Sequence, residues 1–281
     1  MLSVTASVYP LIDIGANLTH NSFDPDRQQC LARAIQANVV KMVITGSDLQ
    51  ESQEAIALAC SNPERYSATV GIHPHYADQF DDSAKDTLES LAKKPQVVAI
   101  GETGLDYFRD ISPRKTQQDS FIAHLELAKK LNKPLFLHQR DAHAAFHSIL
   151  KEHQAELPAV VVHCFTDTAD ALRDYLDLDC YIGITGWICD ERRGTHLLDC
   201  VSTIPLERLM IETDAPYLLP RSLKPKPKTR RNEPCTLPEV LRQISQVRPE
   251  SEAKIASQTT QNAIRFFGLD KLDLDNIENP G

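Results

Sequence analysis

Unbroken apolar runs recur along the chain, and segments with helical periodicity lie between them. Short apolar runs that end in turn residues are typical of strands buried on both faces of a parallel sheet. The runs span Pro10–Asn17, Val39–Gly46, Ser67–His75, Val97–Asp106, Pro134–Asp141, Ala159–Phe165, Cys180–Gly186 and Leu209–Tyr217. Eight strands that alternate with helices predict an α/β fold of the (β/α)8 TIM-barrel type. An open, doubly wound sheet is the alternative.

The segments between the runs have the spacing of amphipathic helices. The segment before Pro134 places four apolar side chains on one face: Phe121, Leu125, Ala128 and Leu131. Gln117 is expected on the outer face of that helix. Residues 251–267 predict an extra C-terminal helix. We expect one domain over residues 1–281, with a core at about 10–268 and short tails, the one from Asp270 onward being polar and frayed.

Composition narrows the class of protein. Of the 281 residues, 42% are hydrophobic and 25% are charged, which is ordinary for a globular protein. No apolar run approaches the roughly 20 residues of a membrane span, and the N-terminus lacks a basic segment followed by an apolar one, so we expect no secretory signal. Seven cysteines without a C-x-x-C pair favour reduced thiols in a cytoplasmic protein.

Charge is unevenly distributed. The net charge is −9, yet residues 221–231 contain six cations and no acid. We call this segment the basic strip; its cations are Arg221, Lys224, Lys226, Lys228, Arg230 and Arg231. An acidic body with one concentrated cationic segment favours an anionic ligand that is bound at one place. Because the strip follows the last predicted strand, we expect it at the face of the barrel where the strands end. There it would attract nucleic-acid phosphates.

Ionisable side chains gather where the predicted strands end. Glu102 ends the fourth run, His138 and His163 lie in the ends of the fifth and sixth, and Asp214 lies near the end of the eighth. A barrel brings these ends to one face. Two imidazoles and two carboxylates form a mixed nitrogen and oxygen metal site. Burial of four such groups without a cation would be costly, so we favour a metal site over a structural cluster.

Other candidate groups have simpler explanations. His143 and His147 are spaced i, i+4, but the glutamate of H-E-x-x-H is absent. Four further histidines are expected on the surface or on helix faces: His20, His124, His153 and His196. No G-x-S-x-G elbow is present. Cys164 is either a nucleophile or, as we prefer, a small core residue.

Two aromatic residues near the ends of the predicted strands can be interpreted in two ways. Trp187 and Tyr217 are candidate platforms on which a nucleic-acid base would stack. Core packing or a contact with a lid explains them equally well. Arg192 and Arg193, after the seventh run, would extend the phosphate-binding surface.

Motifs along nearly the whole chain resemble the TatD family of metal-dependent deoxyribonucleases. The matching segments are Asp13–Leu18, Gly71–His75, Gly101–Asp106, His138–Ala142, His163–Phe165, Gly183–Trp187, Asp190–Gly194, Glu212–Tyr217 and Arg231–Pro234. They occur in order between Asp13 and Phe267. The segments DIGANL and DERRG point to TatD proper among its relatives.

The resemblance implies a metal-dependent 3′-5′ exonuclease. Single-stranded or frayed DNA ends, with tolerance of RNA, would be the substrate, and DNA degradation or repair would be the role. Glu102, His138 and His163 would bind the metal, and Asp214 would be a further ligand or the base that orients water. Residues expected to contact the substrate are Asn17, His73, His75, Arg140, Arg192, Arg193, Lys226, Lys228, Arg230, Arg231 and Asn232.

One departure from the family pattern bears on the metal. Many relatives carry D-x-H-x-H on the first strand, where two histidines complete a binuclear site. Gly15 and Asn17 occupy those positions here, which argues against a strongly held second ion. Fewer nitrogen ligands favour Mg²⁺, with Mn²⁺ or Zn²⁺ as alternatives.

Two other function classes fit parts of the sequence. One is a barrel metallohydrolase that cleaves a small amide, lactone or ester, or the aminoacyl ester at a tRNA end. The basic strip argues against a small substrate. The other is a non-enzymatic nucleic-acid or protein-binding barrel, which the four candidate ligands argue against. No obligate protein partner is evident.

Overall fold

The computed structural model describes residues 5–269, so the expected tail from Asp270 onward lies outside the described residues. Eight strands form one sheet in sequence order, β1 to β8. A doubly wound sheet reverses its strand order at a switch point, whereas sequential order with intervening helices is the connectivity of a barrel. The predicted (β/α)8 fold is therefore confirmed. The chain divides into two compact units, Met1–Val43 with Gly183–Gly281, and Ile44–Ile182.

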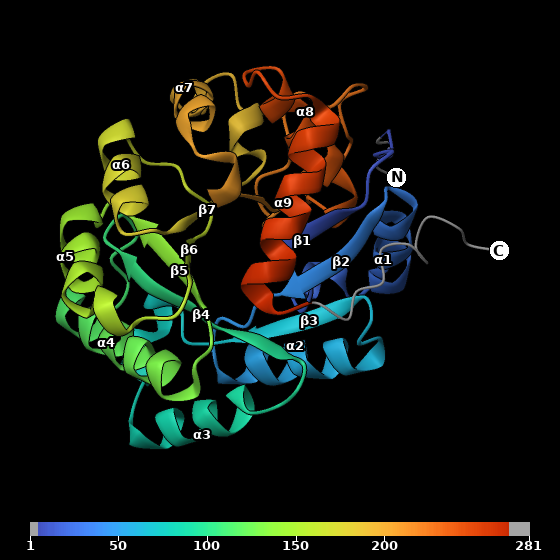
Figure 1. Ribbon diagram of the computed structural model, residues 1–281. Coiled ribbons are helices and arrows are strands. Elements are labelled where there is room, and N and C mark those ends of the chain that lie inside the picture. The colour runs from blue at the N-terminus through green and yellow to red at the C-terminus, as the bar shows by residue number, and fades with distance from the viewer. Residues whose placement is uncertain (1–4, 270–281) are drawn as a thin grey trace. The chain divides into compact units, whose positions relative to one another are not determined.

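The unit of residues 44–182 contains four whole strands and their helices. Its elements are α2 (Leu49–Ser61), β3 (Tyr66–Val70), η2 (Pro74–Gln79), α3 (Asp82–Ala92), β4 (Val97–Asp106), α4 (Arg114–Leu131), β5 (Leu135–Arg140), α5 (His143–His153), η3 (Gln154–Glu156), β6 (Val160–Val162) and α6 (Ala169–Asp177). Helix α2 lies against β3, and α4 lies against β4 (Figure 1). Strand β3 is buried along its length, and β4 is buried except at Val98.

The other unit combines the two ends of the described chain. Its elements are β1 (Leu11–Ala16), η1 (Asn21–Phe23), α1 (Arg27–Gln36), β2 (Val39–Ile44), β7 (Tyr181–Ile184), η4 (Gly186–Cys189), α7 (Thr195–Thr203), η5 (Leu206–Arg208), β8 (Leu209–Ile211), η6 (Pro234–Thr236), α8 (Leu237–Ser245) and α9 (Glu252–Phe267). Strands β2 and β7 each cross the boundary between the units by one or two residues.

The strands coincide with the apolar runs but are shorter at their polar ends. Strand β4 matches its run completely, Val97–Asp106. Strands β6 and β8 contain only Val160–Val162 and Leu209–Ile211. The polar residues that follow them, such as His163 and Asp214, therefore belong to loops. Neighbouring strands from β3 to β7 pair in parallel.

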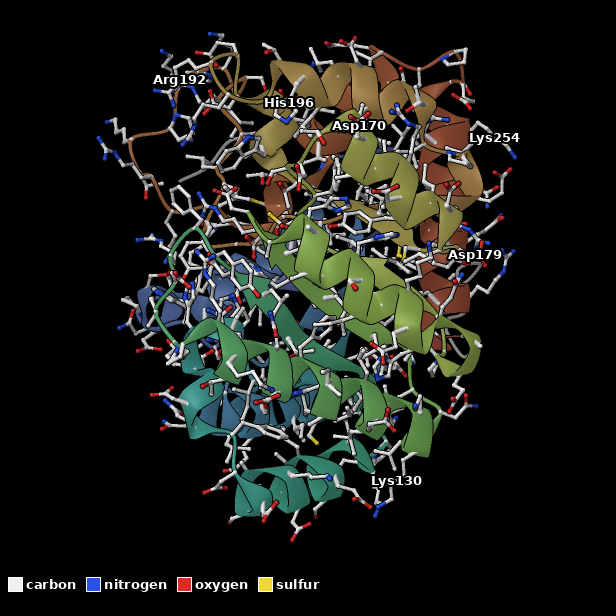
Figure 2. The ribbon with its side chains drawn as sticks, turned by 90° about the vertical axis from the view of Figure 1, so that its left-hand side faces the viewer. Lys130, Asp170, Asp179, Arg192, His196 and Lys254 are labelled. Atoms are coloured by element: carbon white, nitrogen blue, oxygen red, sulfur yellow. The ribbon has the colours of Figure 1, made fainter. Side chains whose placement is uncertain are left out.

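The expected C-terminal helix is present as α9 (red in Figure 1). Ser251 caps its first turn, and Gly268 ends it in the left-handed conformation that glycine adopts easily. Buried Asn262 donates to the carbonyl oxygens of Leu206 and Leu209, which ties α9 to β8. The opposite face carries exposed residues such as Lys254, which points away from the ribbon in Figure 2. Among residues 5–269, no helix combines the length and apolar character needed to cross a membrane.

Two polar side chains of α4 are buried against the loops that leave β3 and β4. Gln117 was expected outside but is fully buried; it accepts a hydrogen bond from the Asp106 amide and donates to the Ser112 carbonyl. His124, expected on the surface or on a helix face, lies on α4 and is also fully buried, with Nε2 accepting from the Ile72 amide. The outward expectation for Gln117 was wrong because backbone groups in these loops need buried partners.

A network of charges joins α1 to η6 in the unit that contains both chain ends. Arg33 bonds Glu233 at 2.7 Å, and Arg231 bonds both Asp26 at 2.7 Å and Glu233 at 2.9 Å. The Glu233 side chain is only 4% exposed. Its charge therefore depends on the two guanidinium groups for compensation.

Replacement of Arg231 by Met should lower the free energy of unfolding by about 2 kcal/mol, because Glu233 would keep its buried charge with one partner fewer. The matched control is Arg230→Met. Arg230 is exposed and should change stability by less than about 0.5 kcal/mol. Urea denaturation of both variants measures the difference, and equal midpoints would contradict the assignment.

The same network makes a prediction for acid stability. Hydrogen bonding to Arg231, opposed by burial and aided by Arg33, lowers the pKa of Asp26 from 3.8 to about 2. A carboxyl group whose pKa is lower in the folded state contributes stability above its unfolded pKa and loses it as the pH falls through the folded value. From about pH 4 to about pH 2, the urea midpoint should therefore fall more steeply for wild type than for Asp26→Asn. Equal declines of the urea midpoint in the two proteins would exclude a contribution of Asp26 to stability in this pH range.

Candidate metal centre

Strand β4 brings Glu102 close to β5 through two flanking glycines. The register of the β4–β5 pair shifts between Ile100 and Thr103. Gly101 and Gly104 have φ values of 139° and 144°. A Cβ atom at either position would lie 2.0 Å or less from a carbonyl oxygen of β5. Only glycine allows this close approach, so the G-E-T-G sequence has a structural reason that is separate from its chemistry.

One carboxylate oxygen of Glu102 faces three imidazole rings. Oε1 lies 2.9 Å from His163 Nε2, 3.0 Å from His138 Nδ1 and 3.4 Å from His73 Nε2. We call these four residues the Glu102 cluster. They come from the ends of β3, β4, β5 and β6, all within the unit of residues 44–182. Residues far apart in the sequence thus meet at one oxygen atom.

A second carboxylate, Asp106, lies beside the cluster. Its Oδ2 atom accepts a hydrogen bond from His75 Nε2 at 2.8 Å and lies 3.5 Å from His138 Nε2. Its Oδ1 atom accepts from the Arg109 amide. Asp106 is 1% exposed, whereas the His75 side chain is 26% exposed. Asp106 therefore orients two imidazoles, one of which reaches the solvent.

The electrostatic environment keeps both carboxylates ionised. Burial alone raises the pKa of Glu102, but the imidazoles of His163 and His73 hold that pKa well below its ordinary value. Burial likewise raises the pKa of Asp106, and the neighbouring imidazoles of His138 and His75 more than reverse the effect. Burial lowers the pKa of His73 to about 3, so this ring is neutral near pH 7.

The donor atoms suit a divalent cation. Those of His73, Glu102 and His138 lie within 4.8 Å of one another, and His163 adds a further imidazole at 2.9 Å from Glu102. An octahedral ion with bonds of about 2.1 Å separates neighbouring donor atoms by about 3 Å, close to the distances around Glu102 Oε1. Two buried carboxylates also leave negative charge that a divalent ion would balance. The residues present therefore fit a metal ion.

Asp214 belongs to the other unit, where its partner is Asn17. The Asn17 amide donates to Asp214 Oδ1 at 2.9 Å, and the Asp214 backbone has the left-handed φ of 53°. Nearby Asp13 is fully buried and accepts from the Thr213 amide and hydroxyl. Burial raises the pKa of Asp13 to about 8 against those hydrogen bonds. Asn17 thus holds the Asp214 carboxylate in place.

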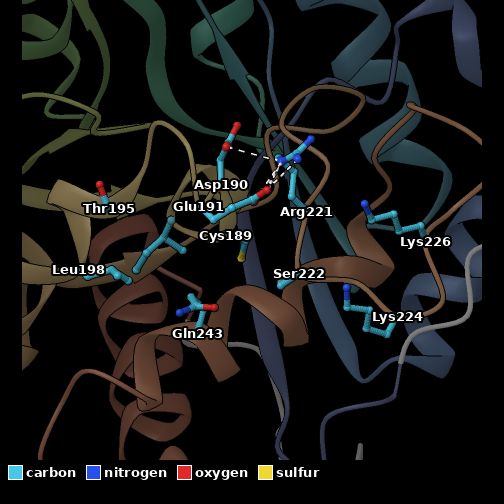
Figure 3. Close-up of a pocket in the computed structure, with 11 residues that line it drawn as sticks. Cys189, Asp190, Glu191, Thr195, Leu198, Arg221, Ser222, Lys224, Lys226 and Gln243 are labelled. Carbon is cyan, nitrogen blue, oxygen red and sulfur yellow. Dashed lines mark hydrogen bonds and ion pairs between the residues drawn. The ribbon is translucent and has the colours of Figure 1, made fainter.

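The basic strip contains both paired and unpaired cations. Arg221 pairs with Glu191 and, more distantly, with Asp190. Figure 3 shows these pairs at the edge of a pocket of about 440 Å³, which Lys224 and Lys226 also line. Elsewhere in the strip, Arg231 belongs to the α1–η6 network described above, and its neighbour Asn232 is fully buried and donates to the Thr213 carbonyl. Four exposed cations make no ion pair within residues 5–269: Lys224, Lys226, Lys228 and Arg230.

The expected extension of this surface after β7 is neutralised locally. Arg192 and Arg193 both bond the buried carboxylate of Asp190, although Arg192 still reaches the molecular surface (Figure 2). Arg193 also covers the ring of Trp187, with 4.4 Å between guanidinium carbon and ring centroid. Tyr217 is 51% exposed and contacts His20 edge-on. Trp187 therefore already has a stacking partner in Arg193.

Two roles at the site were not predicted from the sequence. Asp106 ends the matching segment Gly101–Asp106, but nothing in the sequence linked it to His75 or His138. His73 was expected to contact substrate, yet it lies in the Glu102 cluster. Its i, i+2 spacing to His75 in the segment HPH is the only sequence signal that the two rings serve one site. Pro74 between them lets the chain turn so that the rings meet edge-on at 4.2 Å.

Comparisons with known proteins agree on one family. The family model for TatD-related DNase matches residues 12–268. A 3′-5′ ssDNA/RNA exonuclease TatD from Pantoea ananatis is 47% identical over 259 residues, covering 92% of this chain and all of that protein. A 3′-5′ ssDNA/RNA exonuclease TatD from Edwardsiella piscicida is 48% identical over 259 residues, and the match again covers 92% of this chain and all of that protein.

Solved structures give the same result. A TatD homologue from Escherichia coli K12 has a TM-score of 0.84 at 27% identity and covers 92% of this chain and 98% of its own. A TatD-family hydrolase from Entamoeba histolytica has a TM-score of 0.84 at 28% identity, with coverages of 94% and 99%. Family model, sequence identity and fold therefore agree that this chain belongs to the TatD-related DNase family.

Proposed function

We propose that this chain is a metal-dependent 3′-5′ exonuclease that shortens single-stranded or frayed DNA ends and also accepts RNA. The observation that carries the proposal is the Glu102 carboxylate oxygen facing three imidazoles within hydrogen-bonding or ion-pair distance. Relatives at 47% identity that are named 3′-5′ ssDNA/RNA exonucleases support the substrate and direction. Degradation or repair of DNA is the corresponding cellular role.

The arrangement of the Glu102 cluster indicates a role for each of its residues. Glu102, His138 and His163 hold the ion, His73 is a further donor, and Mg²⁺ is the favoured metal. When bound, the ion lowers the pKa of a water molecule and offsets charge on a phosphoryl oxygen. Asp214, held by Asn17, accepts the proton of the attacking water or serves as a further ligand.

Asp106 has a supporting task in this proposal. Its bond to His75 Nε2 fixes the tautomer of that ring, so His75 Nδ1 is left as an acceptor. Because His75 is partly exposed, it can contact the bound strand while Asp106 stays buried. The unpaired lysines of the basic strip would hold the phosphates of the strand.

The proposal treats the chain as one catalytic domain with its core at about residues 10–268. All seven cysteines are free thiols, which supports a reducing, cytoplasmic location.

Replacement of Glu102 by Gln keeps the shape of the side chain and removes its charge. We expect loss of metal binding, measured by calorimetry, and a fall in kcat on the order of 10³-fold or more, because metal ligand and charge balance vanish together. The assay is a 5′-labelled single-stranded oligonucleotide with Mg²⁺, which should give a ladder that shortens from the 3′ end and stops on chelation.

Glu126→Gln is the matched control, since Glu126 is half-exposed and pairs with Lys129 of α4 and His153 of α5, away from the Glu102 cluster. It should leave turnover and metal binding unchanged. Undiminished turnover by Glu102→Gln would place the catalytic site elsewhere. Release of an amino acid from charged RNA, with the oligonucleotide left intact, would instead favour an esterase.

Replacement of Lys224, Lys226 and Lys228 by Gln tests the basic strip. Each lost contact with single-stranded nucleic acid lowers the slope of log affinity against log salt by about 0.7, so the triple variant should lose about 2. KM should rise while kcat stays near wild type. The control replaces three exposed lysines that make no ion pair among the described residues: Lys85, Lys94 and Lys254. Identical salt slopes for the two triple variants would remove the strip from the substrate site.

A further inference from the structure

Exposed apolar side chains concentrate beside the Glu102 cluster. Among residues 5–269, five large hydrophobic side chains are exposed: Val8, Tyr76, Phe108, Ile111 and Tyr217. Three of them lie on the loops that follow β3 and β4. A hydrogen bond of 3.1 Å from the Ser112 hydroxyl to the His75 carbonyl joins these two loops. Scattered exposed apolar residues need no explanation, but three on joined loops next to a metal centre do.

Phe108 has the geometry of a stacking platform. The Arg140 guanidinium carbon lies 3.9 Å from the centroid of its ring, which covers one face. The residue is nevertheless 55% exposed, so the opposite face is open to solvent. Neighbouring Tyr107 differs, because its hydroxyl accepts from Gln118 and its ring lies under Arg114. Phe108 is therefore the aromatic ring of this loop that can accept a planar partner.

The ring is held at a fixed place relative to the metal centre. Phe108 follows Asp106 by two residues, and Arg140 follows His138 by two. The Tyr107 amide donates to the Arg140 carbonyl at 2.9 Å, and Arg140 pairs with Asp106 in the last step of the β4–β5 register. Buried Gln117 bonds the backbone at Asp106 and Ser112, which fixes both ends of the loop. A preformed loop loses little entropy when a ligand binds.

Charge beside the ring suits a nucleotide. Arg109 and Arg140 flank Phe108 in the loop and in the cation–π pair, and neither makes an ion pair within the described part of the chain. Arg192, Arg193, Arg221 and Arg231 are all neutralised by carboxylates. An open aromatic face next to two uncompensated cations matches a base with its phosphate.

We propose that Phe108, backed by Arg140, stacks on an unpaired base at the 3′ end of the strand and thereby selects single-stranded ends. This inference rests on the proposed function and adds a specificity-determining residue to it. A base within a duplex already has neighbours on both faces, so it has no free face for the ring. Stacking tolerates every base, which fits an exonuclease that must remove each nucleotide in turn.

The test combines protein variants with a modified substrate. Phe108→Leu keeps apolar bulk and removes the aromatic face, Phe108→Trp keeps a face, and Ile111→Ala is the control from the same exposed loop. Each protein receives a 5′-labelled oligonucleotide with normal bases and the same strand with abasic sites at its two 3′-terminal nucleotides. KM and kcat are measured for the first cleavage, and melting curves establish that each variant folds.

Phe108→Leu should raise KM roughly tenfold on the normal strand and by less than about twofold on the abasic strand, with kcat nearly unchanged. Phe108→Trp and Ile111→Ala should resemble wild type on both. An unchanged KM on the normal strand, or an equal rise on both strands, would overturn the proposal. The second result would show that Phe108 only orders the loop.

Equilibrium binding separates this inference from the proposed function. With chelator present, fluorescence anisotropy should give roughly a tenfold weaker Kd for Phe108→Leu on the normal strand and little change on the abasic strand. If wild type cleaves neither strand with Mg²⁺ or Mn²⁺, the nuclease proposal fails, yet the difference between the Kd changes on the two strands still decides whether Phe108 stacks on a base. If wild type cleaves but Phe108→Leu changes Kd equally on both strands, only the stacking proposal fails.

Discussion

The contact between one Glu102 oxygen and three imidazoles is the interaction on which the rest of the site depends. The group is 6% exposed, so its charge has lost most of its hydration and needs compensation from its neighbours. Hydrogen bonds with His163 and His138 supply part of it, and a divalent cation would supply the rest. The surrounding loops contribute to the Glu102 cluster, since each one carries an imidazole or a carboxylate to it.

Backbone shape and buried hydrogen bonds hold the cluster in place. Gly101 and Gly104 let β4 approach β5 closely, which sets Glu102 against His138. Gln117 and His124 bond the backbone of the loops after β4 and β3 from inside α4. Neither side chain faces the reacting atoms, yet both restrict where Asp106 and His73 can lie. Such preorganisation matters because catalytic and metal-binding groups tolerate little displacement.

Local carboxylates decide which cations remain available to a substrate. In the sequence, the cations of the basic strip and the two arginines after β7 are equal candidates for binding phosphate. In the structure, Arg231 stabilises a buried glutamate, and Arg192 and Arg193 share Asp190. Lys224 and Lys226, in contrast, face solvent without an ion pair in the described chain. Charge counting therefore overestimates the number of phosphate-binding groups, since a paired cation is largely screened by its partner.

The sequence by itself determined the fold class and pointed to most of the residues of the Glu102 cluster. Apolar runs with helical segments between them allow few arrangements other than a barrel, because each strand must be covered on both faces. The polar ends of those strands identified Glu102, His138 and His163.

Contacts between distant segments were decided only by the tertiary structure. The bond between Asp106 and His75 and the cover of Phe108 by Arg140 join residues about 30 positions apart. The burial of Gln117 and His124 depends on unpaired backbone groups in loops that follow other strands. Periodicity reports which face of an element is apolar, but it carries no information about a polar partner that arrives from another element. For that reason the grouping of Glu102, His138 and His163 could be predicted, whereas the side chains that orient them and the ring beside them could not.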